Sequence, residues 1–358
     1  MKRSIYSFIV GLIIVLVSQS CERNIYFVPT DQERKLVINS YVIAGDSIYI
    51  QVSQSQLFSD LSHDIKVRDI NPDQLEVSLL INDEKVPVEM IPDSIFGHRG
   101  HPNLVAKKAP QPGDRVTISA TYPGVKPVTS SLVLPAIPSI GKLSYKVKEE
   151  EPEVDHTGST YTYDPNTGKR QETKIIRTTY SKGFYFDLSV YDDTEQRNFY
   201  LLSITAVEHR VIDGVRTPII VSRKFKTDDP NFKEASFGIP FLDESGNSDY
   251  FILSDTQFKG ATYPFSFSTK VVYRTETEQG GELFVRESDL PEDLEVVVQV
   301  AQLTEGAYYF LRSMNALSAA AGNPLTEPVR VHTNIEGGLG IFAGFSFTSS
   351  STLIPMKH

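Results

Sequence analysis

The glycine-rich segment 337–344 is the part of the sequence that could form a phosphate-binding loop. It reads Gly-Gly-Leu-Gly-Ile-Phe-Ala-Gly. A dinucleotide-binding loop needs G-x-G-x-x-G between a strand and a helix, so that the helix N-terminus meets the pyrophosphate. Here the last spacing is one residue too long, and the chain continues with strand-like residues. We therefore interpret Gly337, Gly338 and Gly340 as structural glycines of a tight turn or bulge, where a Cβ atom would clash, and predict no cofactor.

Two other clusters carry side chains that can bind metal ions. His98 and His101 are three residues apart, so a strand would place their imidazoles on opposite faces; in a loop they could converge, but no acidic third ligand lies beside them. Residues 243–249 are rich in the oxygen ligands that calcium prefers, but they lack EF-hand spacing and helical flanks. We expect a polar turn at 243–249 and predict no metal site.

Catalytic chemistry has little support in the sequence. No G-x-S-x-G nucleophile elbow occurs, and the chain has a single cysteine, which excludes an intramolecular disulfide and a Cys-based zinc site. A carboxylate pair could still assemble from the 45 Asp and Glu residues, because the separation that defines such a site is a property of the tertiary structure. We predict a protein that is not an enzyme, with an envelope hydrolase that uses dispersed carboxylates as an alternative.

The single cysteine, Cys21, follows a segment with the features of a secretory signal. Lys2 and Arg3 make a basic start, residues 5–17 are mostly apolar, and small or polar residues at 18–20 precede the cysteine. The apolar run is too short to span a bilayer, which needs about 20 residues.

We interpret residues 1–20 as a lipoprotein signal peptide, Cys21 as the lipidated residue and residues 21–31 as an acylated tether. Several acyl chains would anchor the protein far more firmly than the marginal binding that one chain provides. Ser18 departs from the leucine that is usual at that position of a lipobox. An incidental cysteine behind an ordinary signal peptide is the alternative.

The charge balance excludes some partners. Lys and Arg number 35 against 45 Asp and Glu, which gives a formal net charge of −10. Nucleic-acid binding depends on cationic contacts with phosphates, so we predict no nucleic-acid partner. An acidic protein also gains no attraction from anionic lipid, and the acyl chains must provide the attachment to the outer-membrane lipid.

Residues 149–173 form a long polar excursion with few residues that could be buried. We expect an acidic loop or a protruding hairpin there, with a Pro-Asn-Thr-Gly turn at 165–168. A solvated segment without a role is one interpretation. The other is a contact with a basic surface of a partner protein, made by the carboxylates of Glu149, Glu150, Glu151, Glu153 and Asp155.

Alternation of apolar and polar residues with a period of two dominates residues 32–135. Segments 75–81 and 116–122 alternate in this way, and turn residues follow both of them. We expect residues 32–135 to form an N-terminal immunoglobulin-like β-sandwich of about seven short strands. A proline-rich linker at 134–138 would end this domain.

Residues 136–358 are also strand-rich. Alternation marks 184–190 and 265–273, whereas apolar residues between 307 and 321 fall at helical spacing, with Thr304 as the N-cap. We therefore expect an all-β protein in which the N-terminal sandwich is followed by a larger β-rich domain, sandwich or barrel-like, with one packed helix.

The run Asn334–Phe342 reads Asn-Ile-Glu-Gly-Gly-Leu-Gly-Ile-Phe. It resembles the closing Asn-Ile-x-Gly-Gly-x-Gly-x-Phe signature of a Bacteroidetes lipoprotein family catalogued as domain of unknown function 4249, and residues 112–118 resemble a strand of the same family. The likeness covers nearly all of the chain after the signal. It implies a setting in the outer membrane, often alongside TonB-dependent transporters, and it transfers no catalytic residue.

These features together predict a non-catalytic outer-membrane lipoprotein that binds or assembles with a TonB-dependent transporter or another envelope protein. A nutrient- or glycan-binding lipoprotein is the alternative. A cleft lined by Tyr and Phe would favour ligand capture, a buried carboxylate pair would favour the hydrolase, and a flat apolar patch would favour a protein partner. The sequence does not distinguish the periplasmic from the cell-surface face.

Replacement of the lipidated residue tests the anchor. Cys21→Ser removes the thiol that would carry a lipid, so the variant should remain an uncleaved or mislocalised precursor. Metabolic labelling with a fatty-acid analogue measures this directly. Equal labelling of the variant and the unmodified protein would contradict the assignment.

Overall fold

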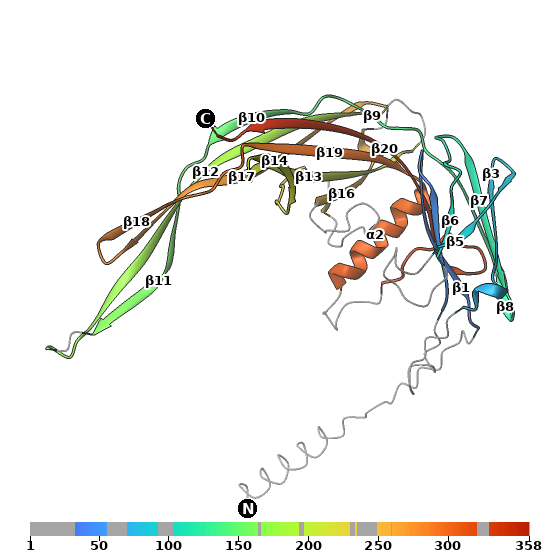
Figure 1. Cartoon of the computed structure of the whole chain (residues 1–358), viewed down its shortest axis with the longest axis horizontal. Helices are drawn as coiled ribbons and strands as arrows, with labels where there is room; N and C mark the ends of the chain where they lie inside the picture. The colour runs from blue at the N-terminus through green and yellow to red at the C-terminus, as the bar shows by residue number, and fades with distance from the viewer. Residues whose placement is uncertain are drawn as a thin grey trace, which may run out of the picture. The chain divides into compact units, whose positions relative to one another are not determined.

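The computed structural model describes residues 33–55, 70–91, 103–163, 166–192, 197–229, 233–234, 249–258, 260–320 and 329–357. The predicted signal peptide 1–20, Cys21, the tether 21–31, His98, His101 and most of 243–249 lie outside the described residues. Within the described ranges strands dominate, and α2 (Glu305–Ala320) is the only α-helix (Figure 1). The predicted all-β fold with one packed helix is confirmed.

The N-terminal core lies between two sheets. Every second residue of β1 (Leu36–Ile43) is buried, as the alternation predicts, because successive side chains of a strand point to opposite faces. The core is mostly aliphatic, and Ile38, Ile50, Leu79 and Ile118 are almost fully buried in it. One sheet has the order β4 (Glu84–Val86), β3 (Glu76–Ile81), β7 (Arg115–Tyr122), β8 (Val125–Val133). The other side is formed by β1, β2 (Ile48–Gln54), β6 (Asn103–Ala106) and β5 (Glu89–Ile91).

The second core lies between the remainder of that larger sheet and a six-stranded sheet. It is rich in phenylalanine, and the rings of Phe186 and Phe267 stack with centroids 4.8 Å apart. The larger sheet has ten strands, which include β15 (Lys233–Glu234), β16 (Asp249–Ser254), β13 (Phe199–Ile212), β14 (Val215–Val221), β19 (Asp293–Leu303) and β20 (Leu339–Pro355). The six-stranded sheet consists of β9 (Ser139–Ile140), β10 (Ser144–Glu149), β11 (Glu153–Tyr163), β12 (Arg170–Tyr191), β17 (Thr262–Gln279) and β18 (Glu282–Glu287).

Helix α2 covers the other face of the ten-stranded sheet (Figure 1). Its buried residues are Ala307, Tyr308 and Leu311, and the Tyr308 ring stacks on Phe199 of β13 at 4.5 Å between centroids. Thr304 precedes the helix as expected. Its hydroxyl group accepts a hydrogen bond from the backbone N–H of Gly344 (3.0 Å) and thereby attaches the helix to β20.

A parallel pairing of β1 with β20 joins the two predicted domains in one sheet. Ile38 lies opposite Gly340, and the pairing extends from Val37 to Ile43. Strands from residues 32–135 and from 136–358 therefore share the ten-stranded sheet, although the second core contains residues of 136–358 alone. The boundary between residues 135 and 136 stays a prediction.

The closing run Asn334–Phe342 makes this pairing possible. The Asn334 side-chain amide makes the two hydrogen bonds that the backbone of a paired strand would make to Phe342. Its Nδ2 donates to the Phe342 carbonyl (2.7 Å), and its Oδ1 accepts from the Phe342 N–H (2.9 Å). Gly337 has φ +77° and Gly340 has φ +98°. A Cβ on Gly340 would collide with the Ile38 carbonyl, and one on Gly338 would lie 2.6 Å from the Leu36 carbonyl oxygen.

The segment 149–173 is a hairpin and not a loop. Strands β11 and β12 pair from Glu153 with Thr179 to Tyr163 with Arg170. Of the two forms expected from the sequence, the acidic loop is wrong. The reason is that β11 and β12 pair through their backbones along the whole of β11, and backbone pairing requires no buried face.

Substitution of Gly340 tests the close contact between β1 and β20. Gly340→Ala should destabilise the protein by more than the ~1–2 kcal/mol that a left-handed conformation costs an L-residue, because the new methyl group also meets the Ile38 carbonyl. Gly337→Val and Gly338→Val should also lower the thermal midpoint. Gly124→Ala is the control, since Gly124 has φ +76° but open space around its Cβ position. Equal losses for Gly340→Ala and Gly124→Ala would show that the contact with β1 contributes nothing.

Candidate functional site

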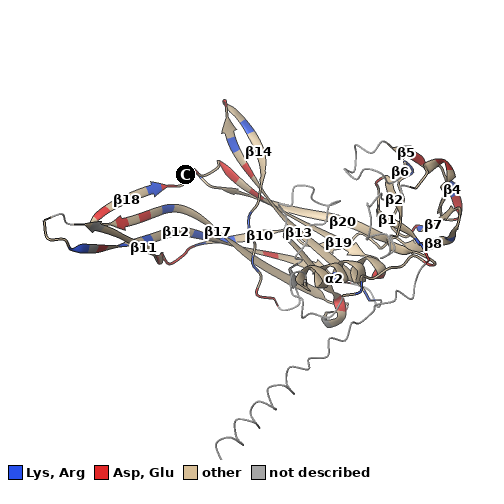
Figure 2. Ribbon diagram, turned by 90° about the horizontal axis from the view of Figure 1, so that it is seen from below, with Lys and Arg blue, Asp and Glu red and all other residues tan. Residues whose placement is uncertain are grey.

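Two neighbouring hairpins, β11–β12 and β17–β18, continue beyond the second core. We call residues 153–180 and 274–287 of these strands the arm. Its strands pair side by side, as in the row Val154, Thr178, Glu276, Val285. Acidic and basic residues are interspersed along them (Figure 2). The arm therefore presents two sheet faces and two edges, which are formed by β11 and β18.

The two faces of the arm can be assigned from the register. Phe184 and Phe186 of β12 are buried in the core, so the even-numbered residues of β12 lie on the core side of this sheet. Residues directly opposite one another in paired strands share a face. Val154 and Val285 therefore lie on the core-side face with Thr178, and Glu153 lies on the outer face with Thr179.

The structure separates the five acidic residues that the sequence singled out. Glu149 lies opposite Lys182 on the core-side face, whereas Glu150 and Glu153 contact outer-face residues. Asp155 lies opposite Arg177 on the outer face. Glu151 lies between β10 and β11, and its side chain is exposed. They do not form one acidic surface.

On the outer face, Glu150 and Glu153 share one cation. The Lys270 ammonium group lies 2.7 Å from Glu153 Oε1 and 3.6 Å from Glu150 Oε2, and the Tyr185 hydroxyl group donates to Glu150 Oε1 (2.6 Å). The Tyr185 bond, followed by Lys270, lowers the pKa of Glu150, and Lys270 lowers the pKa of Glu153. Glu153 in turn raises the pKa of Lys270. Both carboxylates are therefore bound within the chain at neutral pH.

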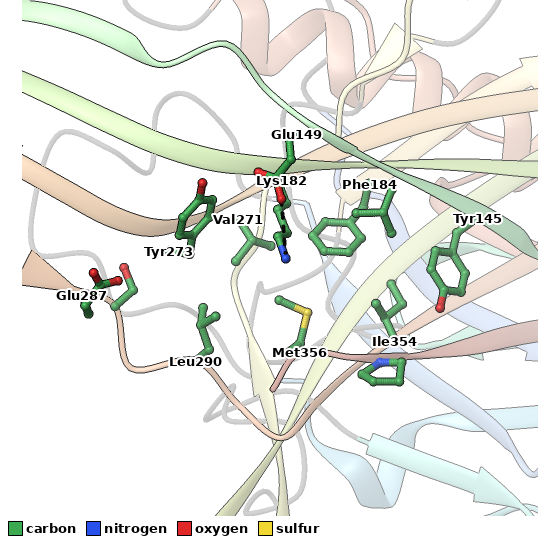
Figure 3. A pocket seen from close by; sticks show the side chains of 13 residues that line it. Tyr145, Glu149, Lys182, Phe184, Val271, Tyr273, Glu287, Leu290, Ile354 and Met356 are labelled. Carbon is green, nitrogen blue, oxygen red and sulfur yellow. Dashed lines mark ion pairs between the residues drawn. The ribbon is translucent and has the colours of Figure 1, made fainter. Parts of the chain in front are cut away.

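A cavity of about 570 Å³ lies on the core-side face where the second core ends. Phe184, Val271 and Ile354 belong to the core and line it at one side. In Figure 3 the Lys182 side chain extends between Val271 and Phe184, with Met356 nearby. Its other lining residues are Tyr145, Val147, Glu149, Tyr273, Glu287, Ser288, Leu290 and Pro355.

The polar groups of this cavity are few and have defined roles. Glu149 Oε1 lies 3.6 Å from the Lys182 ammonium group. Burial, followed by the nearby Glu149 carboxylate, raises the pKa of the Tyr273 hydroxyl group, which therefore stays protonated and able to donate a hydrogen bond. A cavity with apolar walls, two phenols, one ion pair and the side chains of Glu287 and Ser288 can bind a small molecule that has an apolar face and polar edges.

Beyond the cavity, the core-side face of the arm carries apolar side chains on β11, β12 and β18, with the carboxylates of Glu276 and Glu278 on β17 between those of β12 and those of β18. Val154 is 62% exposed, Leu283 60% and Val285 49%. Tyr161 and Tyr163 extend the stripe along β11, and Arg170 lies 4.2 Å from the centroid of the Tyr161 ring. We call Val154, Tyr161, Tyr163, Ile176, Leu283 and Val285 the apolar stripe. Of these, Val154, Tyr161, Tyr163, Leu283 and Val285 are exposed, so no described element covers them.

Two buried carboxylates stand apart from the cavity. The Asp192 Oδ1 atom accepts from the Tyr200 hydroxyl group (2.6 Å) and from Asn198 Nδ2 (2.8 Å), and Asp255 Oδ2 accepts from the Asn198 N–H (2.6 Å). These bonds fix the start of β13. In the described part of the chain, no three His, Cys, Asp or Glu side chains are grouped to hold a metal ion. No helix there is long and apolar enough to cross a membrane.

Sequence reasoning missed the cavity and the apolar stripe. Glu149 and Lys182 are far apart in sequence, and only the pairing of β10 with β12 brings them together. The alternation Leu283, Val285 beside a Gly-Gly turn was a usable signal for β18, because a glycine pair between alternating residues is typical of a hairpin.

Removal of the Lys270 ammonium group tests the outer-face cluster. In Lys270→Gln the pKa of Glu153 should rise toward its ordinary value, and that of Glu150 should rise less, because the Tyr185 bond remains. Since folding lowers these pKa values, the ion pairs contribute stability above the ordinary carboxylate range and lose it as the pH falls. NMR titration of labelled glutamates measures the shifts. Lys182→Gln, which removes a cation from the other face, should leave both values unchanged.

The chain was compared with known proteins. A search of the curated proteins found no match. A solved structure from work described as "Structural basis for the promiscuous specificity of the carbohydrate-binding modules from the beta-sandwich super family" is similar over 72% of this chain and 96% of that chain, at 10% identity. Its TM-score is 0.20, which supports no conclusion about fold or ligand. The family model described as domain of unknown function DUF4249 matches residues 23–351. Because this match covers almost the whole chain, the protein belongs to the DUF4249 family.

Proposed function

We propose that this protein is a non-catalytic, Bacteroidetes-type lipoprotein, anchored to the outer membrane through acylated Cys21. Its work is to bind another envelope protein, such as a TonB-dependent transporter, and to assist its assembly or activity. The apolar stripe on the core-side face of the arm is the observation that carries the proposal.

The apolar stripe has the composition of a protein contact. It continues the face that forms the second core, and its side chains leave water only when another surface covers them. Burial of apolar area contributes about 25 cal/mol per Å², so a partner that covers several of these side chains gains affinity from the stripe. Exposed apolar side chains gathered on one face mark interaction sites. Glu276 and Glu278 lie among them on β17, so the contact also includes two carboxylates.

Charge contributes less to this contact than the acidic sequence of residues 149–155 would suggest. Glu149, Glu150 and Glu153 are each ion-paired with Lys182 or Lys270 within the chain. A basic partner would have to compete with these lysines. We therefore expect the partner to bind mainly through apolar contact, with weak dependence on salt.

The cavity supports a second candidate function, the capture of a small nutrient or glycan. Tyr145 and Tyr273 provide aromatic surfaces, and the Glu149–Lys182 pair provides polar ones. A carbohydrate ring has the matching apolar face and hydroxyl groups. Calorimetry with a panel of carbohydrates would first identify one that binds the unmodified protein. Tyr273→Ala should then abolish binding of that carbohydrate and leave binding of the protein partner unchanged.

Affinity purification of the full chain from detergent-solubilised membranes of its native host tests the protein partner. Val154→Asp and Tyr161→Asp should each reduce the co-purifying protein about tenfold or more, because burying an unpaired carboxylate costs more than the ~1.4 kcal/mol that corresponds to tenfold in affinity. Thr277→Asp is the matched control, since it adds the same carboxylate to the outer face of the arm. Retention of every partner by both stripe variants would refute the proposed contact.

A further inference from the structure

Strand β18 is an edge strand of the arm. It pairs with β17 on one side, and no other described strand pairs with it. All six of its side chains are exposed, and Leu283, Phe284 and Val285 follow one another. Proteins normally shield such edges with very short or bulged strands, proline or charged side chains, because an open edge accepts another strand. Strand β18 has no proline and no bulge, and its charged residues are Glu282, Arg286 and Glu287.

The turn before β18 determines which backbone groups point outward. Gly280 and Gly281 have φ of +65° and +86°, and Gln279 lies opposite Glu282 across this two-residue turn. In such a turn the fourth residue donates its N–H to the first, so the Glu282 backbone faces β17. The direction alternates along a strand. Leu283, Val285 and Glu287 therefore direct their N–H and C=O groups to the free edge.

The sequence of β18 is complementary to itself when it is reversed. It reads Glu-Leu-Phe-Val-Arg from Glu282 to Arg286. If two copies pair antiparallel about Phe284, Leu283 lies opposite Val285 of the second copy, and Glu282 lies opposite Arg286. Both residue pairs, Leu283 with Val285 and Glu282 with Arg286, occur twice in the dimer, as two-fold symmetry requires. Leu283 and Val285 then exchange the outward backbone hydrogen bonds.

We propose that β18 is a homodimerisation edge, at which two copies of this chain form one continuous antiparallel sheet about Phe284. This inference is independent of the partner proposed for the apolar stripe. Neighbouring registers are poorer: a centre at Val285 would place Phe284 opposite Arg286 and Leu283 opposite Glu287. Only the register about Phe284 combines two opposite-charge pairs with an apolar centre, the kinds of cross-strand pair that stabilise sheets.

The charged residues of β18 are available for this pairing. In the described part of the chain, Glu282 and Arg286 make no ion pair, whereas Arg274 on the adjacent strand is paired with Glu276 and Glu287. The side chains of Glu282 and Arg286 lie on the outer face with Phe284. Leu283 and Val285 lie on the core-side face. The dimer would thus place the apolar stripes of both copies on the same side of the joined sheet.

A charge exchange tests the register. With the full chain purified in detergent, Glu282→Arg and Arg286→Glu should each weaken dimerisation about tenfold in sedimentation experiments, because like charges then face each other. The double variant has the composition of the unmodified chain and should restore dimerisation to within about threefold. A monomeric unmodified chain, or a double variant as weak as the single ones, would overturn the proposal.

A cysteine at the symmetry centre provides a second test that does not depend on charge. Phe284 would face its copy as a non-hydrogen-bonded pair with Cα atoms about 4.5 Å apart, which is within the range of a disulfide. In a Cys21→Ser background, Phe284→Cys should give a disulfide-linked dimer on mild oxidation. Ile220→Cys on β14 is the matched control, since Ile220 is 56% exposed and Phe284 55%. Equal cross-linking at both positions would count against the edge.

Discussion

The parallel pairing of β1 with β20 is the contact on which the rest of the structure depends. Strand β20 supplies side chains to all three hydrophobic clusters: Phe342 to the N-terminal core, Phe345 to the contact with α2, and Ile354 to the second core. It can do so only if its first residues pass close to β1. Gly340 permits that passage beside the Ile38 carbonyl, and Asn334 holds the Phe342 backbone in place. The run Asn334–Phe342 is therefore a structural junction between β1 and β20.

The candidate site arises from a difference in strand length. Strand β12 has 22 residues and β17 has 18, whereas β19 of the opposing sheet has 11. Where the opposing sheet ends, near Ile354 and Met356, the core gives way first to the cavity and then to the apolar stripe. A single sheet face thus changes from a core to a binding surface without a change in its alternation. This is why the cavity and the stripe share the same side.

The two proposed contacts use different parts of the arm. The stripe lies on a sheet face, and its side chains would provide the affinity for a partner protein. The β18 edge offers backbone N–H and C=O groups, and the register of the side chains along it would provide the specificity for a second copy. The outer face has a third role. There Lys270 binds Glu150 and Glu153, which fixes the connection between β10 and β11 against β12 and β17. The acidic segment therefore stabilises the arm, and its charges are largely balanced within the chain.

Local patterns in the sequence determined much of the fold. Alternation predicted the strands around Ile118 and Phe186, helical spacing predicted α2, and the spacing at Gly337–Gly344 argued against a phosphate loop, because each depends on neighbours along the chain. The cavity, the stripe and the sharing of one sheet by both halves were decided by the tertiary structure. They depend on register and strand length between segments far apart, such as Glu149 with Lys182 and Ile38 with Gly340. Alternation determines that a strand has an apolar face, but only the extent of the opposing sheet decides whether that face becomes a core or stays exposed.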